Sequence, residues 1–231
     1  MGRGGSGTIF FCGCNLACVF CQNHDISQSV TGREMTPRQI AELMMGLEAS
    51  GCENVNFVSP THVAHAVAEA VFMARGQGLA VPVVYNSGGY DSVGTLRALD
   101  GLIEIYMPDF KWADAAAGRR FSQVDDYPDT AKAALREMYR QVGPLITDAR
   151  GVATRGLLVR HLVMPGNLAG SEEAIGVIAD IAPGCAINVM GQYRPAYKAM
   201  QHPELRFCPD PAEVRRLREY AAARGLRRVD G

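Results

Sequence analysis

The feature that most constrains the fold is a regular alternation of short apolar stretches with helix-forming stretches. The apolar stretches have the length and β-branched composition of buried strands, and they cover residues 8–11, 55–58, 81–85, 102–107, 156–163 and 186–189. Strands that alternate with helices predict βαβ units, and therefore an α/β fold with a parallel sheet and outer helices. The pattern fits an open doubly wound sheet as well as a complete or partial barrel.

Helix boundaries are marked by specific local signals. Thr36, Pro37 and Gln39 form a capping-box signature with proline at the first helical position, and Gly51 ends that helix. Further helices are predicted at 63–74, near Leu96 and Leu99, at 134–142, after a capping Ser171 and after Asp210. The polar stretch 109–126 predicts a long loop. Because no repeat, linker or low-complexity block interrupts the pattern, residues 1–231 are expected to form one domain.

Charge and hydropathy narrow the classes of partner and compartment. The formal net charge is −1, so neither nucleic acid nor a membrane surface is expected as a partner. No apolar stretch reaches the roughly 20 residues that span a bilayer. The glycine-rich start has no hydrophobic signal region, and a cytoplasmic location is therefore predicted.

The cysteines are unevenly distributed. Four of the seven, Cys12, Cys14, Cys18 and Cys21, lie within ten positions, and the other three are scattered. An odd total without a signal peptide argues against a secreted disulfide framework. In a reducing compartment, a local cluster of cysteines indicates metal binding or redox chemistry, whereas scattered cysteines are typical of core positions.

The spacing Cys14-x-x-x-Cys18-x-x-Cys21 is the strongest chemical signal. Three thiolates on one short loop can bind three irons of a [4Fe–4S] cluster, which otherwise takes four cysteine ligands. The open fourth iron could chelate the amino and carboxylate groups of S-adenosylmethionine (SAM). One electron from the cluster would then break a carbon–sulfur bond and give a 5′-deoxyadenosyl radical, while the protein positions and shields it. These three cysteines are therefore the candidate metal-binding and catalytic residues.

A structural zinc site is the alternative. Zinc binds four thiolates readily, and Cys12, Cys14, Cys18 and Cys21 supply that number. Such a chain would be a zinc-stapled, non-catalytic binding module. The usual paired Cys-x-x-Cys spacing of zinc sites is absent, and Cys12, at the end of the first strand, is interpreted as a packing residue beside the site.

The run from Cys14 to Asn23, CNLACVFCQN, resembles the cluster loop of the radical SAM superfamily. Within it, the chain is similar to the pyruvate formate-lyase activating enzyme-like proteins, a branch with many uncharacterised iron–sulfur proteins. The resemblance covers nearly the whole chain, through TIFF (8–11), YNSGGY (85–90), PDFK (108–111), LVRH (158–161) and QYRP (192–195). It implies a partial (β/α)6 barrel of the radical SAM type, with the cluster at the mouth formed by the carboxyl ends of the strands.

The resemblance also implies cofactor contacts. Phe20, just before the third cysteine, is expected to pack near adenine. Where the superfamily often has a Gly-Gly-Glu-type motif for the SAM amino group, this sequence has Ser-Pro-Thr-His at 59–62, so Thr61 is the candidate. Asn86 is expected to approach the ribose or methionine part. The other candidate contacts are Asn23, Asp109, Lys111, Arg160 and Gln192. The cations suit a carboxylate, although Asp109 and Lys111 could instead pair with each other.

As an enzyme of this family, the chain is expected to cleave SAM reductively and to abstract a hydrogen atom from a substrate. A glycyl residue of a partner enzyme is the substrate that the resemblance suggests. The implied partners are SAM, an electron donor such as flavodoxin or ferredoxin, and a protein substrate. Relatives usually carry an upstream segment with further cysteines, whereas this sequence starts almost at its first strand. We therefore expect either a short variant or a truncated start.

Overall fold

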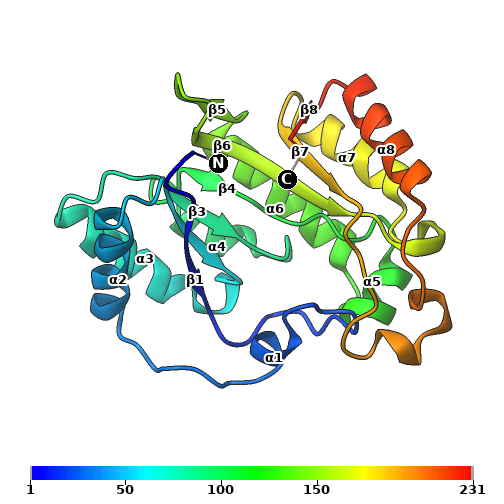
Figure 1. Ribbon diagram of the computed structural model, residues 1–231, viewed down its shortest axis with the longest axis horizontal. Helices are drawn as coiled ribbons and strands as arrows, with labels where there is room; N and C mark the ends of the chain where they lie inside the picture. The colour runs from blue at the N-terminus through cyan, green and yellow to red at the C-terminus, as the bar shows by residue number, and fades with distance from the viewer. Residues whose placement is uncertain (1, 230–231) are drawn as a thin grey trace.

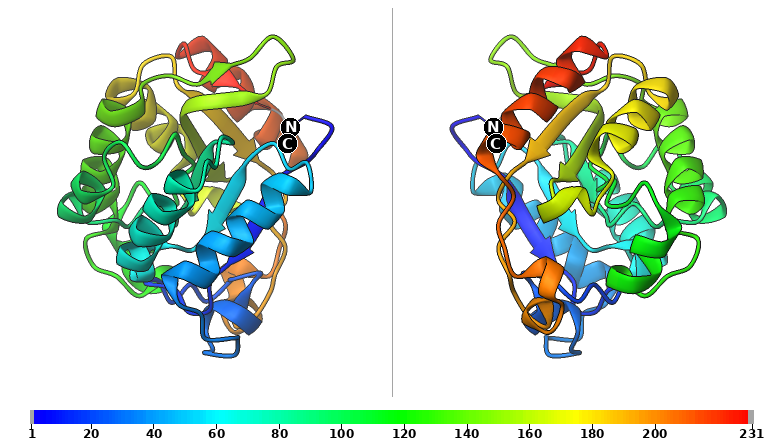
Figure 2. Two further views of the ribbon diagram at one scale, coloured as in Figure 1. Left: turned by 90° about the vertical axis from the view of Figure 1, so that its left-hand side faces the viewer. Right: turned by 90° about the vertical axis from the view of Figure 1, so that its right-hand side faces the viewer.

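The computed structural model describes residues 2–229 and shows a sheet with helices packed on its outside (Figures 1 and 2). The strand order is β1-β2-β3-β4-β6-β7-β8, and all neighbours on this path pair in parallel. The strands are β1 (Gly7–Phe10), β2 (Val55–Val58), β3 (Val83–Asn86), β4 (Ile105–Tyr106), β5 (Ile146–Thr147), β6 (Ala153–Leu162), β7 (Ala186–Met190) and β8 (Arg227–Arg228). The predicted parallel α/β sheet is confirmed, and in residues 2–229 no pairing of β1 with β8 closes it.

All the predicted strands are present, and two further strands were not predicted. β5 pairs antiparallel with β6, and β8 extends the sheet beyond β7. Both additional strands are two residues long and exposed. Unlike β4, which is equally short but buried, neither of them lies in the apolar run on which a sequence prediction depends.

The helices follow the strands in the predicted alternation. They are α1 (His24–Ser27), α2 (Pro37–Ala49), α3 (Ala64–Gly76), α4 (Val93–Ala98), α5 (Ala115–Ser122), α6 (Tyr127–Val142), α7 (Ser171–Ile181) and α8 (Pro211–Ala223). Short 3₁₀ turns occupy Thr61–Val63, Pro165–Asn167, Ala199–Gln201 and Pro203–Leu205. No helix of the described chain is long and apolar enough to cross a membrane.

The predicted helix starts are confirmed at α2 and α8, and the predicted cap of α7 is corrected. At α2, the side chains of Thr36 and Gln39 each accept the other's backbone N–H. At α8, the Asp210 carboxylate accepts the N–H of Ala212 at 2.8 Å. Ser171, however, is not the cap of α7, because Gly170 holds that position. The Ser171 hydroxyl instead forms a hydrogen bond with the buried imidazole of His161.

The stretch 109–126 is not the predicted long loop, because it contains helix α5. The Asp114 carboxylate caps this helix through the N–H of Ala117, and Gln123 ends it with a left-handed φ of 62°. The helix has eight residues and buries a face that includes Ala117 and Phe121. So few apolar positions give no recognisable helical periodicity in the sequence.

Packing of the helices on the sheet leaves one end of its inner face open. On β2, Val55 and Phe57 are fully buried against the helices, and burial of each such side chain contributes about 1.5–3 kcal/mol. Alternate residues point to opposite faces of a strand, so Val84 shares a face of β3 with Asn86. A separate apolar cluster of Val84, Ile105, Leu145 and Ala186 fills this inner face near the amino ends of the strands. The carboxyl ends are therefore where a cavity can form.

Candidate active site

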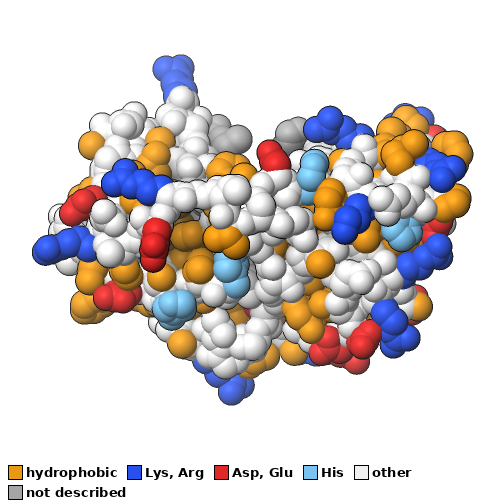
Figure 3. Space-filling model, turned by 90° about the horizontal axis from the view of Figure 1, so that it is seen from below, with side chains coloured by type: hydrophobic (Ala, Val, Ile, Leu, Met, Phe, Trp, Pro, Cys, Tyr) orange, Lys and Arg blue, Asp and Glu red, His pale blue; other side chains and the backbone are white. Residues whose placement is uncertain are grey.

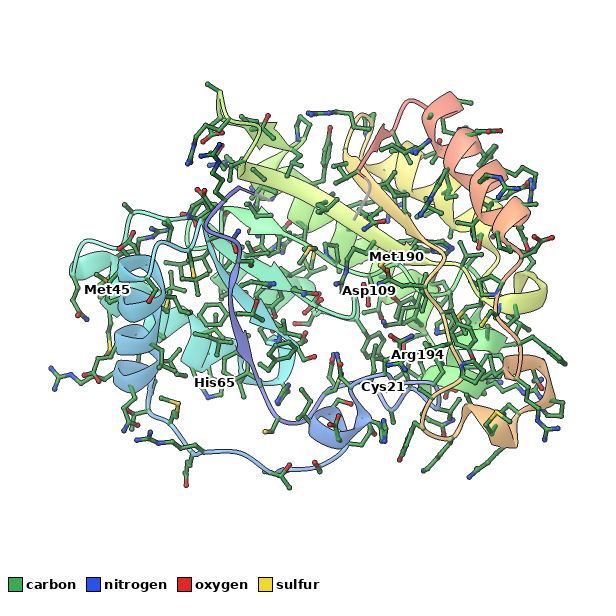
Figure 4. All side chains as sticks on the ribbon, viewed as in Figure 1. Cys21, Met45, His65, Asp109, Met190 and Arg194 are labelled. Carbon is green, nitrogen blue, oxygen red and sulfur yellow. The ribbon has the colours of Figure 1, made fainter. Side chains whose placement is uncertain are left out.

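A cavity of about 260 Å³ lies at the carboxyl ends of the parallel strands, beside the loop that follows β1. Ten of the eleven residues predicted for the site line it: Cys14, Cys18, Phe20, Cys21, Asn23, Asn86, Asp109, Lys111, Arg160 and Gln192. Figure 4 shows Cys21, Asp109 and Met190 at this end of the molecule, with His65 and Met45 on helices away from it. The predicted gathering of these side chains from separate strands is therefore observed.

The cysteine loop is fixed by helix α5. The carbonyls of Phe121 and Ser122, at the end of α5, accept the N–H groups of Val19 and Ala17 at 2.9 and 3.2 Å. On the other side, the Val19 carbonyl accepts the N–H of Lys198 at 2.9 Å. Backbone hydrogen bonds to two segments more than 100 residues further along the chain therefore hold the cysteine loop in its conformation.

Each of the three sulfurs that face the cavity has at least one hydrogen-bonding neighbour. The N–H of Leu16 points to Cys14 Sγ at 3.4 Å. The hydroxyl of Ser122 lies 3.1 Å from Cys18 Sγ, and the hydroxyl of Ser27 lies 3.1 Å from Cys21 Sγ. None of these three neighbours was predicted as part of the site.

Phe20 is buried beneath the cavity. Its ring meets Trp112 edge to face at a centroid distance of 5.5 Å and lies 6.1 Å from the ring of Tyr193. Together these rings form an apolar wall beside the cysteines. Such a wall can bury an aromatic ligand ring and exclude water.

Asp109 is held by two cations at the cavity. Lys111 Nζ lies 2.5 Å from one carboxylate oxygen, and Arg160 Nη2 lies 2.7 Å from the other. Burial acts to raise the pKa of Asp109, but the charges of Arg160 and Lys111 outweigh it, so the pKa is lowered. The alternative pairing of Asp109 with Lys111 is thus present, and Arg160 joins it. Two cations share one carboxylate, so the group retains a net positive charge suited to an anionic ligand.

Thr61 is the predicted site residue that the structure does not bring to the cavity. Its hydroxyl donates to the carboxylate of Asp91 at 2.7 Å. Asp91 is 1% exposed and also accepts from the hydroxyls of Ser87 and Tyr85. Burial raises the pKa of Asp91. The Thr61 hydroxyl is therefore part of a buried network that joins the loops after β2 and β3.

The sequence profile of the Radical SAM superfamily matches residues 8–108. This match supports membership of the radical SAM superfamily. It is similar to the uncharacterized protein MJ0674 of Methanocaldococcus jannaschii, with 34% identity over 211 residues that cover 87% of this chain and 57% of MJ0674. The chain therefore spans little more than half the length of this curated relative.

Solved structures share the fold. A domain of pyruvate-formate lyase-activating enzyme from Bacteroides vulgatus matches with a TM-score of 0.56 at 12% identity, over 77% of this chain and 98% of that domain. Streptococcus suis SuiB, bound to its precursor peptide SuiA, matches with a TM-score of 0.60 at 12% identity, over 97% of this chain and 48% of SuiB. At such identities the likeness shows the fold alone. The superfamily resemblance is confirmed, and the activating-enzyme branch stays a prediction.

Radical SAM proteins generally use a [4Fe–4S] cluster, and in this chain the three cysteines line one cavity. Burial raises the pKa of Cys14, and it raises that of Cys18 to about 11. Metal binding displaces the proton of a cysteine thiol, so the raised pKa values of Cys14 and Cys18 do not prevent iron from binding. A cluster binds each thiolate at a different iron. It therefore needs no convergence of the sulfurs on one point.

A single zinc ion fits less well. Tetrahedral zinc needs four ligands within about 2.3 Å of one point. No group of three or more His, Cys, Asp or Glu side chains in residues 2–229 is arranged to hold a metal ion. Cys12 does not line the cavity, and its sulfur lies 3.2 Å from the Thr31 carbonyl. The fourth thiolate that the zinc-stapled alternative requires is therefore not at the cavity.

Several residues in or beside the cavity were missed by sequence reasoning. Ser59, directly after β2, lines it with a left-handed φ of 55°, and its place at a strand end was an available signal. Ser122 had no such signal, because its helix was not predicted. His161 is fully buried and bonded to the Phe110 carbonyl and to Ser171. It belongs to the core.

Proposed function

We propose that Cys14, Cys18 and Cys21 hold a [4Fe–4S] cluster and that the cavity beside them binds SAM. The observation that carries this proposal is the meeting of three cysteine sulfurs and two cationic side chains on the walls of one cavity. A cluster held by these cysteines would supply the electron for reductive cleavage of SAM, and SAM would supply the radical that abstracts hydrogen from the substrate. The residues of the chain bind and orient the reactants and shield them from water.

The cations at the cavity are proposed to orient SAM through its carboxylate. Lys111 and Arg160 share Asp109 and keep donors for a second anion. Burial acts to lower the pKa of Lys111, but the charge of Asp109 raises it above the usual lysine value. Lys111 therefore stays protonated at neutral pH and holds its charge at the cavity.

Other residues are proposed to position the rest of SAM and to exclude water. Phe20 offers the edge of an apolar wall to adenine, and Asn86, at the end of β3, is 6% exposed and offers an amide to the ribose or methionine part. Asn23 and Gln192 offer further amides at the rim of the cavity. Leu162, Met164 and Met190 add apolar lining, which limits the access of water to a reactive intermediate.

A glycyl residue of a partner enzyme is our proposed substrate, with flavodoxin or ferredoxin as the electron donor. Two structures of this fold support a polypeptide substrate: one is named as a pyruvate-formate lyase-activating enzyme domain, and the other holds a precursor peptide. Figure 3 views the end of the molecule on which the cysteine loop lies. Its middle carries mainly hydrophobic and uncharged side chains, and its charged side chains lie mostly toward the edge.

The test is anaerobic reconstitution of the full chain with iron and sulfide. We expect a brown protein with broad absorbance near ~400 nm, as for thiolate-bound clusters. With SAM and dithionite it should form 5′-deoxyadenosine. Cys14→Ala, Cys18→Ala and Cys21→Ala should each abolish this product, and Cys12→Ala should leave most of it. A colourless protein that holds one zinc would contradict the proposal. If Cys12→Ala loses 5′-deoxyadenosine formation as completely as the other three variants, the ligand assignment is wrong.

The substrate is tested separately. A candidate glycyl radical enzyme labelled with deuterated glycine is added to the reconstituted protein with SAM and reductant. Transfer of deuterium into 5′-deoxyadenosine would support a glycyl substrate. Formation of unlabelled 5′-deoxyadenosine with every such protein tested would argue for another substrate class, without touching the assignment of cluster and SAM.

A further inference from the structure

The sulfurs of Cys18 and Cys21 are each approached by a serine hydroxyl that is itself oriented by another donor. Both O···S distances are 3.1 Å. Ser122 lies at the end of α5 and Ser27 at the end of α1, so the two hydroxyls come from unrelated parts of the chain. The same arrangement at both sulfurs indicates a common role for the two serine hydroxyls.

Ser122 is part of a buried relay. Trp112 Nε1 donates to Ser122 Oγ at 2.7 Å, and an indole N–H can act only as a donor. Ser122 and Trp112 are both 0% exposed, so no water competes for these groups. When Cys18 is a thiolate, its sulfur carries no proton, and the proton of Ser122 is the one that can lie between oxygen and sulfur.

Ser27 repeats the relay on the second sulfur. Gln28 Nε2 lies 3.3 Å from Ser27 Oγ and donates to it, which leaves the Ser27 proton for Cys21 Sγ. Ser27 is 8% exposed. A thiolate at Cys21 would therefore accept from Ser27, as Cys18 would from Ser122.

We infer that Ser122 and Ser27 are positioning residues that donate hydrogen bonds to the ligand sulfurs and make the reduction potential of the bound cluster less negative. This inference rests on the proposed function, since it requires a cluster on these cysteines. An added electron increases the negative charge on the sulfurs, so a donor aimed at them stabilises the reduced form more than the oxidised form. Hydrogen bonds to cluster sulfurs and the neighbours that orient ligands are known means of setting such potentials.

Burial predicts the order of the two effects. Hydrogen bonds are electrostatically stronger where the local dielectric is low. The Ser122 relay ends on a tryptophan inside the core, whereas the Ser27 relay ends on Gln28, whose side chain is exposed. The contribution of Ser122 to the potential should therefore exceed that of Ser27.

The experiment is a redox titration of the reconstituted full chain, followed by the EPR signal of the reduced cluster. Ser122→Ala and Ser27→Ala should each shift the midpoint to a more negative potential, Ser122→Ala by more. Ser27→Thr keeps the hydroxyl and should restore the original midpoint. The matched control is Ser29→Ala, because the Ser29 hydroxyl bonds Asp25 and Thr31 and no sulfur. It should leave the midpoint unchanged.

The outcomes separate this inference from the proposed function. If the alanine variants hold as much iron as the unchanged chain and titrate at the same potential, the inference falls and the cluster assignment stands. If the unchanged chain takes up no cluster, both fall. If Ser122→Ala alone fails to fold or to take up iron, the midpoint potential of Ser27→Ala, at the edge of the loop, decides whether the inference holds. A shift that appears equally in Ser29→Ala would also overturn the inference.

Discussion

The hydroxyl of Tyr127 lies 2.8 Å from the carbonyl oxygen of Gly88 and donates a hydrogen bond to it. The same hydroxyl accepts the backbone N–H of Lys111 at 2.9 Å. One atom of α6 therefore ties the loop after β3 to the segment after β4. Tyr127 is fully buried, and burial raises its pKa far above the usual range, so it acts as a neutral hydroxyl.

Tyr127→Phe should lower the free energy of unfolding by about 1–3 kcal/mol, because a part-buried N–H and a part-buried carbonyl lose their partner. Tyr139→Phe on the same helix is the control, since its hydroxyl bonds the Pro183 carbonyl at an exposed position. Water can replace that bond, and the loss should stay below about 1 kcal/mol. Urea unfolding measures both, and equal losses would contradict the role given to Tyr127.

Gly89→Ala should be more damaging than another substitution at a left-handed glycine. Gly89 has a φ of 77°, and an added Cβ would lie 2.0 Å from the carbonyl oxygen of Asp109. Gly78 has a φ of 96° with open space around it. Gly78→Ala therefore carries only the backbone strain, about 1–2 kcal/mol.

Gly89→Ala adds a steric clash to the backbone strain of a positive φ, and this clash must displace Asp109. The extra loss should appear in urea unfolding, together with weaker SAM binding by the reconstituted protein. A Gly89→Ala variant as stable as Gly78→Ala would show that the loop after β3 can move away from Asp109 at little cost.

The sequence was sufficient for the features that depend on local patterns. The parallel strands were predictable because each is an apolar run between turn signals. The three ligand candidates Cys14, Cys18 and Cys21 were predictable because their spacing is characteristic. The carboxyl ends of parallel strands meet at one edge, which is why Asn86, Asp109 and Arg160 could be brought together before their contacts were known.

Features that depend on tertiary contacts were beyond the sequence. Ser122 is an ordinary serine on a helix too short to predict, and its neighbour Cys18 is 104 residues away. Thr61 follows β2, where a cofactor contact is expected, but its hydroxyl donates a hydrogen bond to the buried carboxylate of Asp91. Ser171 looked like a helix cap because only the folded chain places it beside His161.

Arg160→Met should weaken SAM binding to the reconstituted protein by about tenfold, which is 1.4 kcal/mol. One of the two cations would be lost, and Asp109 would then balance Lys111 and leave no net charge for a carboxylate. Arg216→Met is a suitable control, because Arg216 pairs with Glu172 on the outer helices. Equilibrium dialysis with labelled SAM measures the effect, and unchanged affinity for Arg160→Met would remove Arg160 from the proposed site.

His161 should make the stability of the protein fall as the pH drops below about 6.5, the usual histidine pKa. Its Nδ1–H donates to the Phe110 carbonyl at 2.7 Å, and its Nε2 lies 2.9 Å from the Ser171 hydroxyl. In the neutral ring, Nε2 can accept the Ser171 proton; in the charged ring, both nitrogens are donors.

Burial lowers the pKa of His161 in the folded protein, against the opposing effect of the Phe110 carbonyl. The folded pKa thus lies below the unfolded one, so the stabilisation is present above about pH 6.5 and is lost as the pH falls toward the folded value. The slope can reach about 1.4 kcal/mol per pH unit. Urea unfolding between pH 7.5 and 5.5 (about one unit either side of the histidine pKa) should show a shallower slope for His161→Gln than for the unchanged chain. His65→Gln, at an exposed position of α3, should keep the slope, and an equally steep slope in His161→Gln would rule out the buried imidazole as its source.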